Sequence, residues 1–432
     1  MLLFWFRRDL RLHDNAGFSE ALQSGHEVLP LFIFDKEILD KLDADDARVT
    51  FIHAQISEMH RQLEKHGSTL LVKYGKPLDV LSELMQEYDL EGIYTNHDYE
   101  PYARHRDQQA QALMAKSNLA FETFKDQVIF EQDEILTKSG TPYKVYTPYK
   151  NAWLKAFDPA MAEPQQTEPY FEHLLKHKHT KIISLDQMGF KESALRVPSP
   201  DLRPDTLKDY DKTRDLPAKD ATTHISAHLR FGTVSVREMV QLGLQYNDTW
   251  LQELIWREFF MQLLYHFPEE VDKSFAPKFR HIVWRNNEDE FEKWCLGKTG
   301  FPLVDAGMRE LNQSGFMHNR VRMVVASFLV KDLLIDWRWG EAYFAEKLLD
   351  YEMSSNVGNW QWAAGTGADA QPYFRVFNPD SQVAKFDKQH AYIKRWVPEF
   401  GTPDYPKPMV DHSMARDRAL QAFKDSIADS GM

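Results

Sequence analysis

The sequence predicts an α/β N-terminal domain joined by a long connector to an all-α C-terminal domain. Within residues 1–130, short apolar runs alternate with polar segments that suit helices, which is typical of a parallel sheet covered on both faces. After Asp220, apolar residues recur with helical spacing almost to the end of the chain. At 432 residues the chain is long enough for each domain to bury its own core.

The α/β domain is predicted to contain a five-stranded parallel sheet of the Rossmann-like type. Segments such as Ala44–His66 and Leu78–Tyr88 lie between the strands and suit helices. No GxGxxG motif follows the first strand, where Arg7, Arg8 and Asp9 stand instead, so the standard dinucleotide fingerprint is absent. The predicted strands are Leu2–Phe6, Val28–Phe34, Thr69–Lys73, Gly92–Asn96 and Phe121–Phe130.

Residues 131–209 are predicted to form the connector, because most of this segment is rich in Pro, Lys, His and Glu without a clear period. His173, His177 and His179 are interpreted as residues of a solvated polar segment, and no metal site is predicted. Residues 210–432 are predicted to form the helical domain. Its predicted helices are Val234–Tyr246, Trp250–His266, Glu288–Cys295, Pro302–Asn312, His318–Leu334 and Tyr343–Asp350.

Composition limits the class of protein. The single cysteine, Cys295, excludes an internal disulfide and a cysteine-based zinc site, which fits a cytoplasmic location. No apolar run approaches the ~20 residues of a membrane helix. The 52 Lys and Arg against 65 Asp and Glu give a net charge of −13, unlike a general nucleic-acid binder. A local basic patch remains compatible with this charge, because affinity depends on the cations that contact phosphates.

The segment 350–379 is dense in aromatic residues, asparagines and glycines. If residues 354–362 are helical, Asn356 and Trp360 lie at i and i+4 on one face, and Trp362 points away from that face. An amide and an indole could then contact one ligand while a second indole contacts another. A buried aromatic core with a satisfied asparagine is the alternative interpretation.

Hydroxyl groups precede a predicted helix in the run Asp220–Gly232. Thr222, Thr223 and Ser226 could form an anion site there, because free amides at a helix start favour phosphate. Ordinary Ser/Thr capping explains the same residues.

Two further groups share helical faces. Glu253, Trp256 and Arg257 lie at i, i+3 and i+4, which suits a planar, hydrogen-bonding ligand; a surface ion pair over a core tryptophan is the alternative. A second face combines the amide of Asn319 with Arg322 and the thioether of Met323. Two other arginines, Arg320 and Arg375, could contact phosphates.

Seven long motifs carry a family resemblance. In chain order they are WFRRDLRLHDN, YKVYTPYKNAW, ELIWREFF, GKTGFPLVDAGMR, FMHNRVRMVVASFLVKDLLIDWR, GNWQWAAGTGADAQPYFRVFNP and YPKPMVDHSMARDRALQAFK. Together they resemble the photolyase/cryptochrome family, and they look closest to its class I cyclobutane pyrimidine dimer photolyases. The resemblance implies light-driven repair of UV-damaged DNA, in which excited reduced FAD passes an electron to a flipped-out dimer. The electron returns after the cyclobutane bonds split.

The resemblance also implies roles for individual residues in the helical domain. The implied FAD-binding residues are Tyr210, Thr222, Thr223, His224, Ile225 and Ser226 at the pyrophosphate end, Arg322, Asp350, Tyr351 and Glu352 beside the ring, and Asn356 facing flavin N5. The implied electron chain is Trp360, Trp337 and Trp284. The implied dimer and DNA contacts are Glu253, Trp256, Arg257, Asn319, Met323 and Trp362 at the lesion, and Arg214, Arg320, Arg375 and Gln382 at the backbone.

The chain departs from the family pattern at several positions. Glu352 stands where the second Asp of a DxD motif is usual, and Phe316 stands where Trp is common. For the second, antenna chromophore the resemblance leaves a deazaflavin, a folate or an empty pocket as alternatives. Tyr102 and Ala103 stand where folate-binding members have an Asn-Glu pair, which weakens the case for folate, and the EPY run is similar to members that use a deazaflavin. The chain is expected to be a monomer and to have no membrane partner. A cryptochrome-type blue-light photoreceptor without repair activity is the alternative function.

Overall fold

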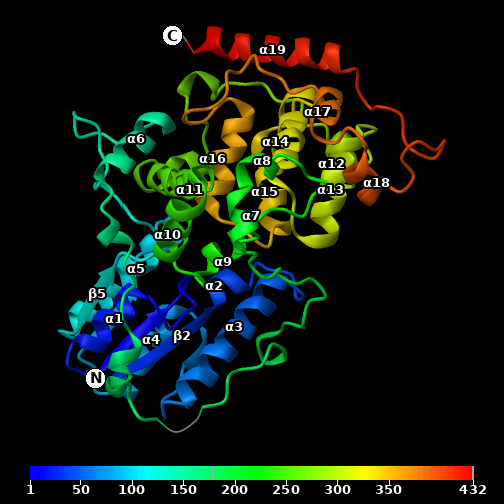
Figure 1. The fold of residues 1–432 in the computed structure, drawn as a ribbon. Helices are drawn as coiled ribbons and strands as arrows, with labels where there is room; N and C mark the ends of the chain where they lie inside the picture. The colour runs from blue at the N-terminus through cyan, green and yellow to red at the C-terminus, as the bar shows by residue number, and fades with distance from the viewer. Residues whose placement is uncertain (178–179, 431–432) are drawn as a thin grey trace. The chain divides into compact units, whose positions relative to one another are not determined.

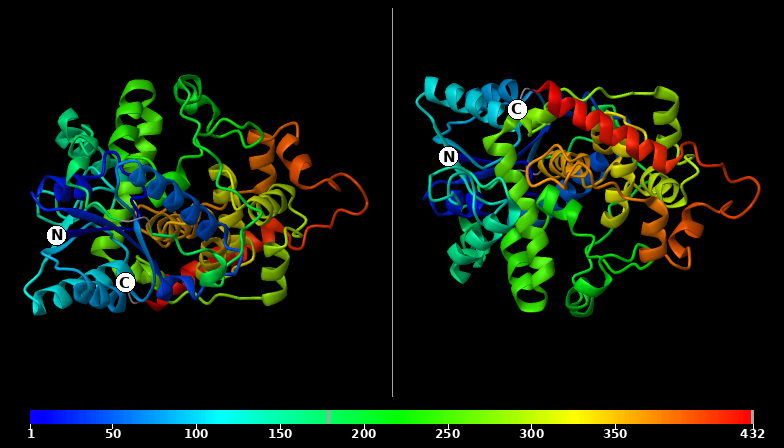
Figure 2. Two further views of the ribbon diagram at one scale, coloured as in Figure 1. Left: turned by 90° about the horizontal axis from the view of Figure 1, so that it is seen from below. Right: turned by 90° about the horizontal axis from the view of Figure 1, so that it is seen from above.

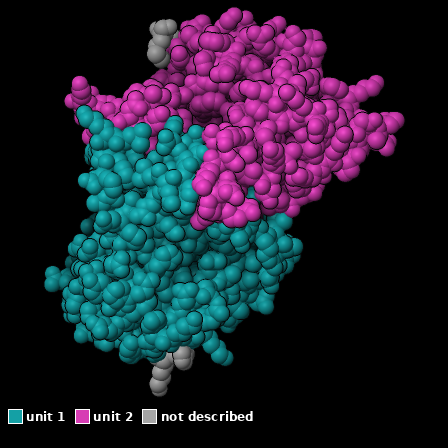
Figure 3. All heavy atoms as spheres, in the orientation of Figure 1, with its two compact units in different colours: residues 1–135, 153–200, 224–254 teal, residues 136–152, 201–223, 255–432 magenta. Residues whose placement is uncertain are grey.

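The computed structural model describes residues 1–177 and 180–430, so His179 lies outside the described residues. The described chain divides into two units, each built from separate stretches of sequence (Figure 3). The first unit contains residues 1–135, 153–200 and 224–254, and the second contains residues 136–152, 201–223 and 255–432. The predicted domain boundaries after residues 130 and 209 stay predictions. No helix of the described chain is long and apolar enough to cross a membrane.

A five-stranded sheet organises the first unit, as predicted. All neighbouring strands are parallel, in the order β3-β2-β1-β4-β5. The prediction that the last strand continues to Phe130 was wrong, because the chain leaves the sheet after Phe124 and turns the carboxylate of Asp126 into a buried ion-pair network. The strands are β1 Leu2–Phe6, β2 Val28–Asp35, β3 Leu71–Gly75, β4 Gly92–Asn96 and β5 Ala120–Phe124.

Helices cover both faces of this sheet, as Figure 1 shows around the blue strands. Side chains of β1 alternate between two cores: Phe4 and Phe6 pack with α1 and α3, whereas Leu3 and Trp5 pack with α4 and α5. This alternation follows from the two-residue period of a strand. The helices of this unit are α1 Ala16–Gln23, α2 Lys36–Leu39, α3 Ala47–Glu64, α4 Pro77–Glu87, α5 Pro101–Lys116, α9 Ser226–Phe231 and α10 Val236–Tyr246.

Part of the predicted connector packs on the α/β core. Phe171, Leu174, Met188 and Phe190 are buried among the residues that cover α1 and α3. The backbone N–H of Leu175 donates to the carbonyl of Val28 at 2.9 Å. The segment therefore completes the apolar core, although its polar composition hides this contribution in the sequence.

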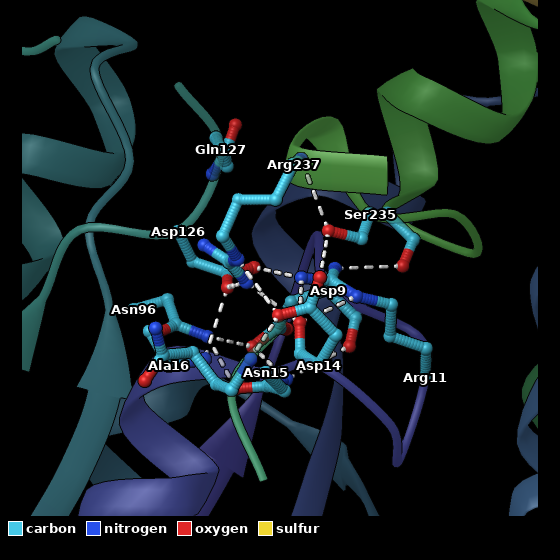
Figure 4. Close-up of polar contacts among 12 residues, drawn as sticks. Asp9, Arg11, Asp14, Asn15, Ala16, Asn96, Asp126, Gln127, Ser235 and Arg237 are labelled. Atoms are coloured by element: carbon cyan, nitrogen blue, oxygen red, sulfur yellow. Dashed lines mark hydrogen bonds and ion pairs between the residues drawn. The ribbon is translucent and has the colours of Figure 1, made fainter. Parts of the chain in front are cut away.

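A buried network joins the carboxyl ends of β1 and β5 to α10 (Figure 4). Asp126 accepts from Arg11 at 2.6 Å and from Arg237 at 2.8 Å. Arg237 also donates to Asp14 at 2.7 Å. Burial favours the neutral carboxyl, but the two guanidinium groups outweigh it and lower the pKa of Asp126 to about 2. Two arginines that share one buried carboxylate therefore fasten α10 to the sheet.

Helices of the second unit pack around α16 with glycines at the closest approaches (Figure 1). A Cβ on Gly358 would lie 2.2 Å from the ring of Phe260, and a Cβ on Gly340 would lie 2.1 Å from Trp360. Only glycine fits there without displacing a ring. The helices are α7 Pro204–Lys208, α8 Tyr210–Thr213, α12 Glu288–Cys295, α13 Pro302–Ser314, α14 Asn319–Ser327, α15 Trp337–Lys347, α16 Met353–Ala364, α17 Pro379–Phe386, α18 Ala391–Trp396 and α19 His412–Asp429.

Two helices span the division between the units, namely α6 Tyr146–Ala156 and α11 Asp248–His266. In Figure 2 the C-terminal helix α19, in red, lies along the outside of the helical unit. The predicted helix His318–Leu334 is wrong in its second half, because Phe328–Asp332 is a π-helix. Its buried Lys331 donates to the carbonyls of Ala364 and Tyr373, at 2.6 and 3.2 Å. The wider π-helical turn places the Lys331 side chain for these contacts.

Candidate functional site

A cavity of about 100 Å³ lies against α16 in the helical unit. Nine residues that the sequence singles out line it: Asn319, Arg322, Met323, Asp350, Tyr351, Glu352, Asn356, Trp360 and Trp362. The remaining lining residues are Ala326, Phe344, Leu348, Ser355, Asn359 and Ala363.

Helix α16 presents two of these residues on one face, as predicted. It begins at Met353 and ends before Gly365, whose φ of 79° favours glycine. Asn356 and Trp360 are both buried and lie at i and i+4, whereas Trp362 is half-buried. Between the tryptophans, the buried Gln361 donates to the carbonyls of Glu270 and Lys273 and accepts from the N–H of Phe275. These bonds fix the rotation of the helix.

The Asn356 amide is held by Glu341 on α15. Its Nδ2 donates to the Glu341 carbonyl at 3.0 Å and to Oε1 at 2.8 Å. Burial raises the pKa of Glu341, and the hydrogen bond from Asn356 partly opposes this rise. With Nδ2 committed to Glu341, Oδ1 is the acceptor that Asn356 offers to a ligand in the cavity.

Two acids of the cavity lining, Asp350 and Glu352, each form an ion pair. Arg322 donates to the two carboxylate oxygens of Asp350 at 2.9 and 3.2 Å, and its Nε donates to the carbonyl of Met317. Arg257 donates to Oε1 of Glu352 at 3.1 Å. Each acid that lines the cavity is therefore paired with an arginine.

The start of α14 presents the amide and thioether predicted for the lesion. His318 caps this helix, and its Nδ1 accepts from the N–H of Arg320 at 3.2 Å. Burial lowers the pKa of His318 to about 4, so the imidazole is neutral near pH 7. Asn319 and Met323 line the cavity, while Arg320 pairs with Asp215 at 2.7 Å.

Two of the three tryptophans of the predicted electron chain are buried, and the third is half-buried. Trp360 lines the cavity and is buried. Trp337 is buried on α15, one turn before the glycine that contacts Trp360. Trp284 is half-buried and packs against Phe423, with ring centroids 6.1 Å apart. This order suits transfer of charge between a buried ligand and solvent.

Trp256 lies outside the cavity lining and stacks on Tyr146, with ring centroids 3.6 Å apart and planes at 9°. The unit boundary falls inside α11, so Glu253 belongs to the first unit and Trp256 to the second. The position of Glu253 relative to the cavity stays a prediction. The same holds for the run 222–226, which the boundary divides after Thr223.

The other predicted contact residues lie elsewhere in the second unit. Arg375 is exposed after α16, and Gln382 is half-buried on α17. The Arg214 guanidinium lies over the ring of Tyr210, 5.4 Å from its centroid. The predicted contacts of Arg375, Gln382 and Arg214 with the DNA backbone, and of Tyr210 with the cofactor, therefore stay predictions. No group of metal-ligating side chains occurs in the part of the chain that the structure describes.

Sequence reasoning missed two residues that support the site. Glu341, which holds Asn356, lies four residues after Trp337, so the i, i+4 spacing was the available signal. Tyr146, which stacks on Trp256, is more than one hundred residues away in sequence. No local pattern could reveal that contact.

Comparison with known proteins identifies the family. Residues 2–168 match the family described as DNA photolyase, and residues 250–403 match the FAD binding domain of DNA photolyase. The deoxyribodipyrimidine photo-lyase of Synechococcus sp. is 35% identical, over 99% of this chain and 96% of that protein. The chain belongs to the DNA photolyase family.

Solved photolyases share its fold. A class III photolyase from Agrobacterium tumefaciens is 35% identical with a TM-score of 0.86, covering 98% of this chain and 97% of that one. An archaeal photolyase from Sulfolobus tokodaii, described with two FAD molecules, is 33% identical with a TM-score of 0.86, covering 98% and 99%.

The cavity of this photolyase family member fits a flavin. It provides an acceptor oxygen on Asn356, paired charges at Asp350 and Glu352, and the indole of Trp360. These groups suit a planar ring system with hydrogen-bonding edges. FAD is therefore the cofactor that residues 250–403 bind as a family domain.

Proposed function

We propose that this chain repairs cyclobutane pyrimidine dimers in DNA by light-driven electron transfer. The observation that carries the proposal is one cavity whose wall joins Asn356 and Trp360 to Trp362, Asn319 and Met323. The first two residues suit a flavin, and the other three suit the edges and faces of a flipped-out dimer.

The residues act by binding and orientation. The chemistry that reduced FAD supplies when bound is light-driven electron donation to the dimer, whose cyclobutane bonds then open before the electron returns. Asn356 would accept a hydrogen bond from the ring through Oδ1, while Glu341 holds its Nδ2. Arg322 holds Asp350 at the cavity wall, where this pair would help to bind the ring. No protein group needs to act as a general acid for bond cleavage.

The direct test is repair of a single thymine dimer in an oligonucleotide under blue light. We expect restored thymines with the reduced holoprotein in light and none in the dark, and no repair of a (6-4) photoproduct. Light-dependent change of the flavin without any dimer repair would contradict the proposal and favour a photoreceptor of the cryptochrome type.

Trp256→Ala is expected to weaken binding of dimer-containing DNA while FAD stays bound. Aromatic stacking contributes about 1–3 kcal/mol per base, so the dissociation constant should rise by about tenfold. Titration of a fluorescent oligonucleotide measures it. Trp339→Phe is the control, because this half-buried indole contacts Phe291 on another part of the unit; equal affinity of wild type and Trp256→Ala would remove Trp256 from the substrate site.

The remaining assignments are predictions about the whole molecule. A second chromophore of the deazaflavin or folate type would appear in the absorption spectrum of small molecules released on denaturation. Light scattering tests the predicted monomer. The cytoplasmic location also stays a prediction.

A further inference from the structure

Glu352 does not behave as an ordinary acid at a helix start. It is the N-cap residue of α16, where a short acidic side chain normally accepts from the second or third amide of the helix. Its carbonyl does begin the helix, accepting from the N–H of Asn356 at 2.8 Å. Its carboxylate makes no such cap bond. Instead, Oε1 accepts from Arg257 at 3.1 Å and Oε2 accepts from the hydroxyl of Ser355 at 3.1 Å.

The Arg257–Glu352 pair is buried, and its carboxylate partner belongs to the cavity lining. The Arg257 side chain is 11% exposed and that of Glu352 is 6% exposed. Glu352 and Ser355 line the cavity. Because a buried carboxylate without a partner is costly, the Glu352 side chain favours the position in which it reaches Arg257.

The extra methylene of glutamate, compared with aspartate, lets the Glu352 carboxylate extend to Arg257. An aspartate at the same position would carry its carboxylate closer to the first turn of α16 and favour the cap. Arg257 would then lose this carboxylate as its counter-ion. The departure from the family's DxD pattern at Asp350–Glu352 is therefore linked to an ion pair with another helix.

The pair also decides the charge beside the flavin. Asp350 is already neutralised by Arg322 at 2.9 Å. Arg257 offsets the charge of Glu352, and a change in either partner alters the charge beside the cavity in a medium of low dielectric constant.

We propose that Glu352, which lines the cavity, is a positioning residue that holds Arg257 by its carboxylate, and that this pair sets the midpoint potential of the bound flavin. The proposal assigns Arg257 a role as counter-ion rather than as a contact to DNA. It rests on the FAD site proposed above.

The test is redox titration of the holoprotein without DNA. Glu352→Gln leaves the positive charge of Arg257 and should shift the midpoint potential upward, because positive charge favours the reduced anionic ring. Arg257→Met leaves the carboxylate and should shift it downward. The double variant should return close to the wild-type value.

The control is Glu399→Gln, which breaks another Arg–Glu pair of the same unit, with Arg309 at 2.6 Å, and should leave the potential unchanged. Shifts of the same sign in Glu352→Gln and Arg257→Met, or no shift in either, would overturn the inference. If the single variants lose FAD, retention of FAD by the double variant supports pairing and its loss refutes it. Wild-type protein that binds FAD but repairs no dimer refutes the proposed function alone.

Discussion

Trp337→Phe is expected to leave almost no photoreduction of the oxidised flavin, while dimer repair by chemically reduced protein stays near the wild-type rate. Phenylalanine is much harder to oxidise than tryptophan, so the chain from Trp360 to Trp284 would be interrupted at its middle position. Repair does not use this chain, because the electron passes from the flavin to the dimer. Absorption spectra under blue light with an external reductant measure the first effect, and the oligonucleotide assay measures the second.

Trp294 provides the matched control for this experiment. It is fully buried and its ring contacts that of Trp360, with centroids 6.2 Å apart. It stands on α12 and is not one of the three tryptophans of the predicted electron chain. Trp294→Phe should therefore keep photoreduction. If Trp294→Phe abolished photoreduction and Trp337→Phe did not, charge would leave Trp360 by the route through α12.

Asp126→Asn is expected to lower the free energy of unfolding by about 3–5 kcal/mol, as is typical when one partner of a buried ion pair is removed. The side chain of Asp126 is fully buried, and the change leaves Arg11 and Arg237 without their shared carboxylate. Urea unfolding of the holoprotein, followed by circular dichroism, measures the loss. Asp45→Asn removes an exposed pair with Lys191 and should change stability by less than about 0.5 kcal/mol.

The same carboxylate gives a pH dependence with a defined sign. The pKa of Asp126 is lowered in the folded protein to about 2, from 3.8 in the unfolded chain. Its contribution is therefore fully present above pH 4 and is lost as the pH falls toward 2. The stability difference between wild type and Asp126→Asn should shrink over that window. A difference that stayed constant between pH 4 and pH 2 would contradict the ion-pair explanation.

The sequence predicts the elements whose signals are local. Continuous apolar runs located all five strands, and the i, i+4 spacing placed Asn356 and Trp360 on one face of α16. The π-helix was not predictable, since its cause is the reach of Lys331 to carbonyls of two later segments. The end of β5 was missed for the same kind of reason, because Asp126 is drawn away by Arg237 from another part of the chain.

The site was predictable where the residue types themselves carry the chemistry. Nine of the residues singled out from the sequence line one cavity. The contacts that hold them were harder to foresee: Glu341 behind Asn356, Tyr146 on Trp256, and Arg257 on Glu352. Each joins two elements whose closeness depends on packing, and two of the closest approaches occur at Gly340 and Gly358, where no side chain records the contact.

The buried Gln361 has a consequence for attempts to change which DNA lesion this protein binds. Because its amide ties α16 to the loop that includes Glu270 and Phe275, the helix cannot turn to accommodate a larger neighbour on either side. Substitutions beside Trp362 should therefore alter the choice of lesion without disturbing Trp360. A directed-evolution library that leaves Gln361 unchanged could thus vary the lesion that is bound while Trp360 keeps its place at the predicted flavin site.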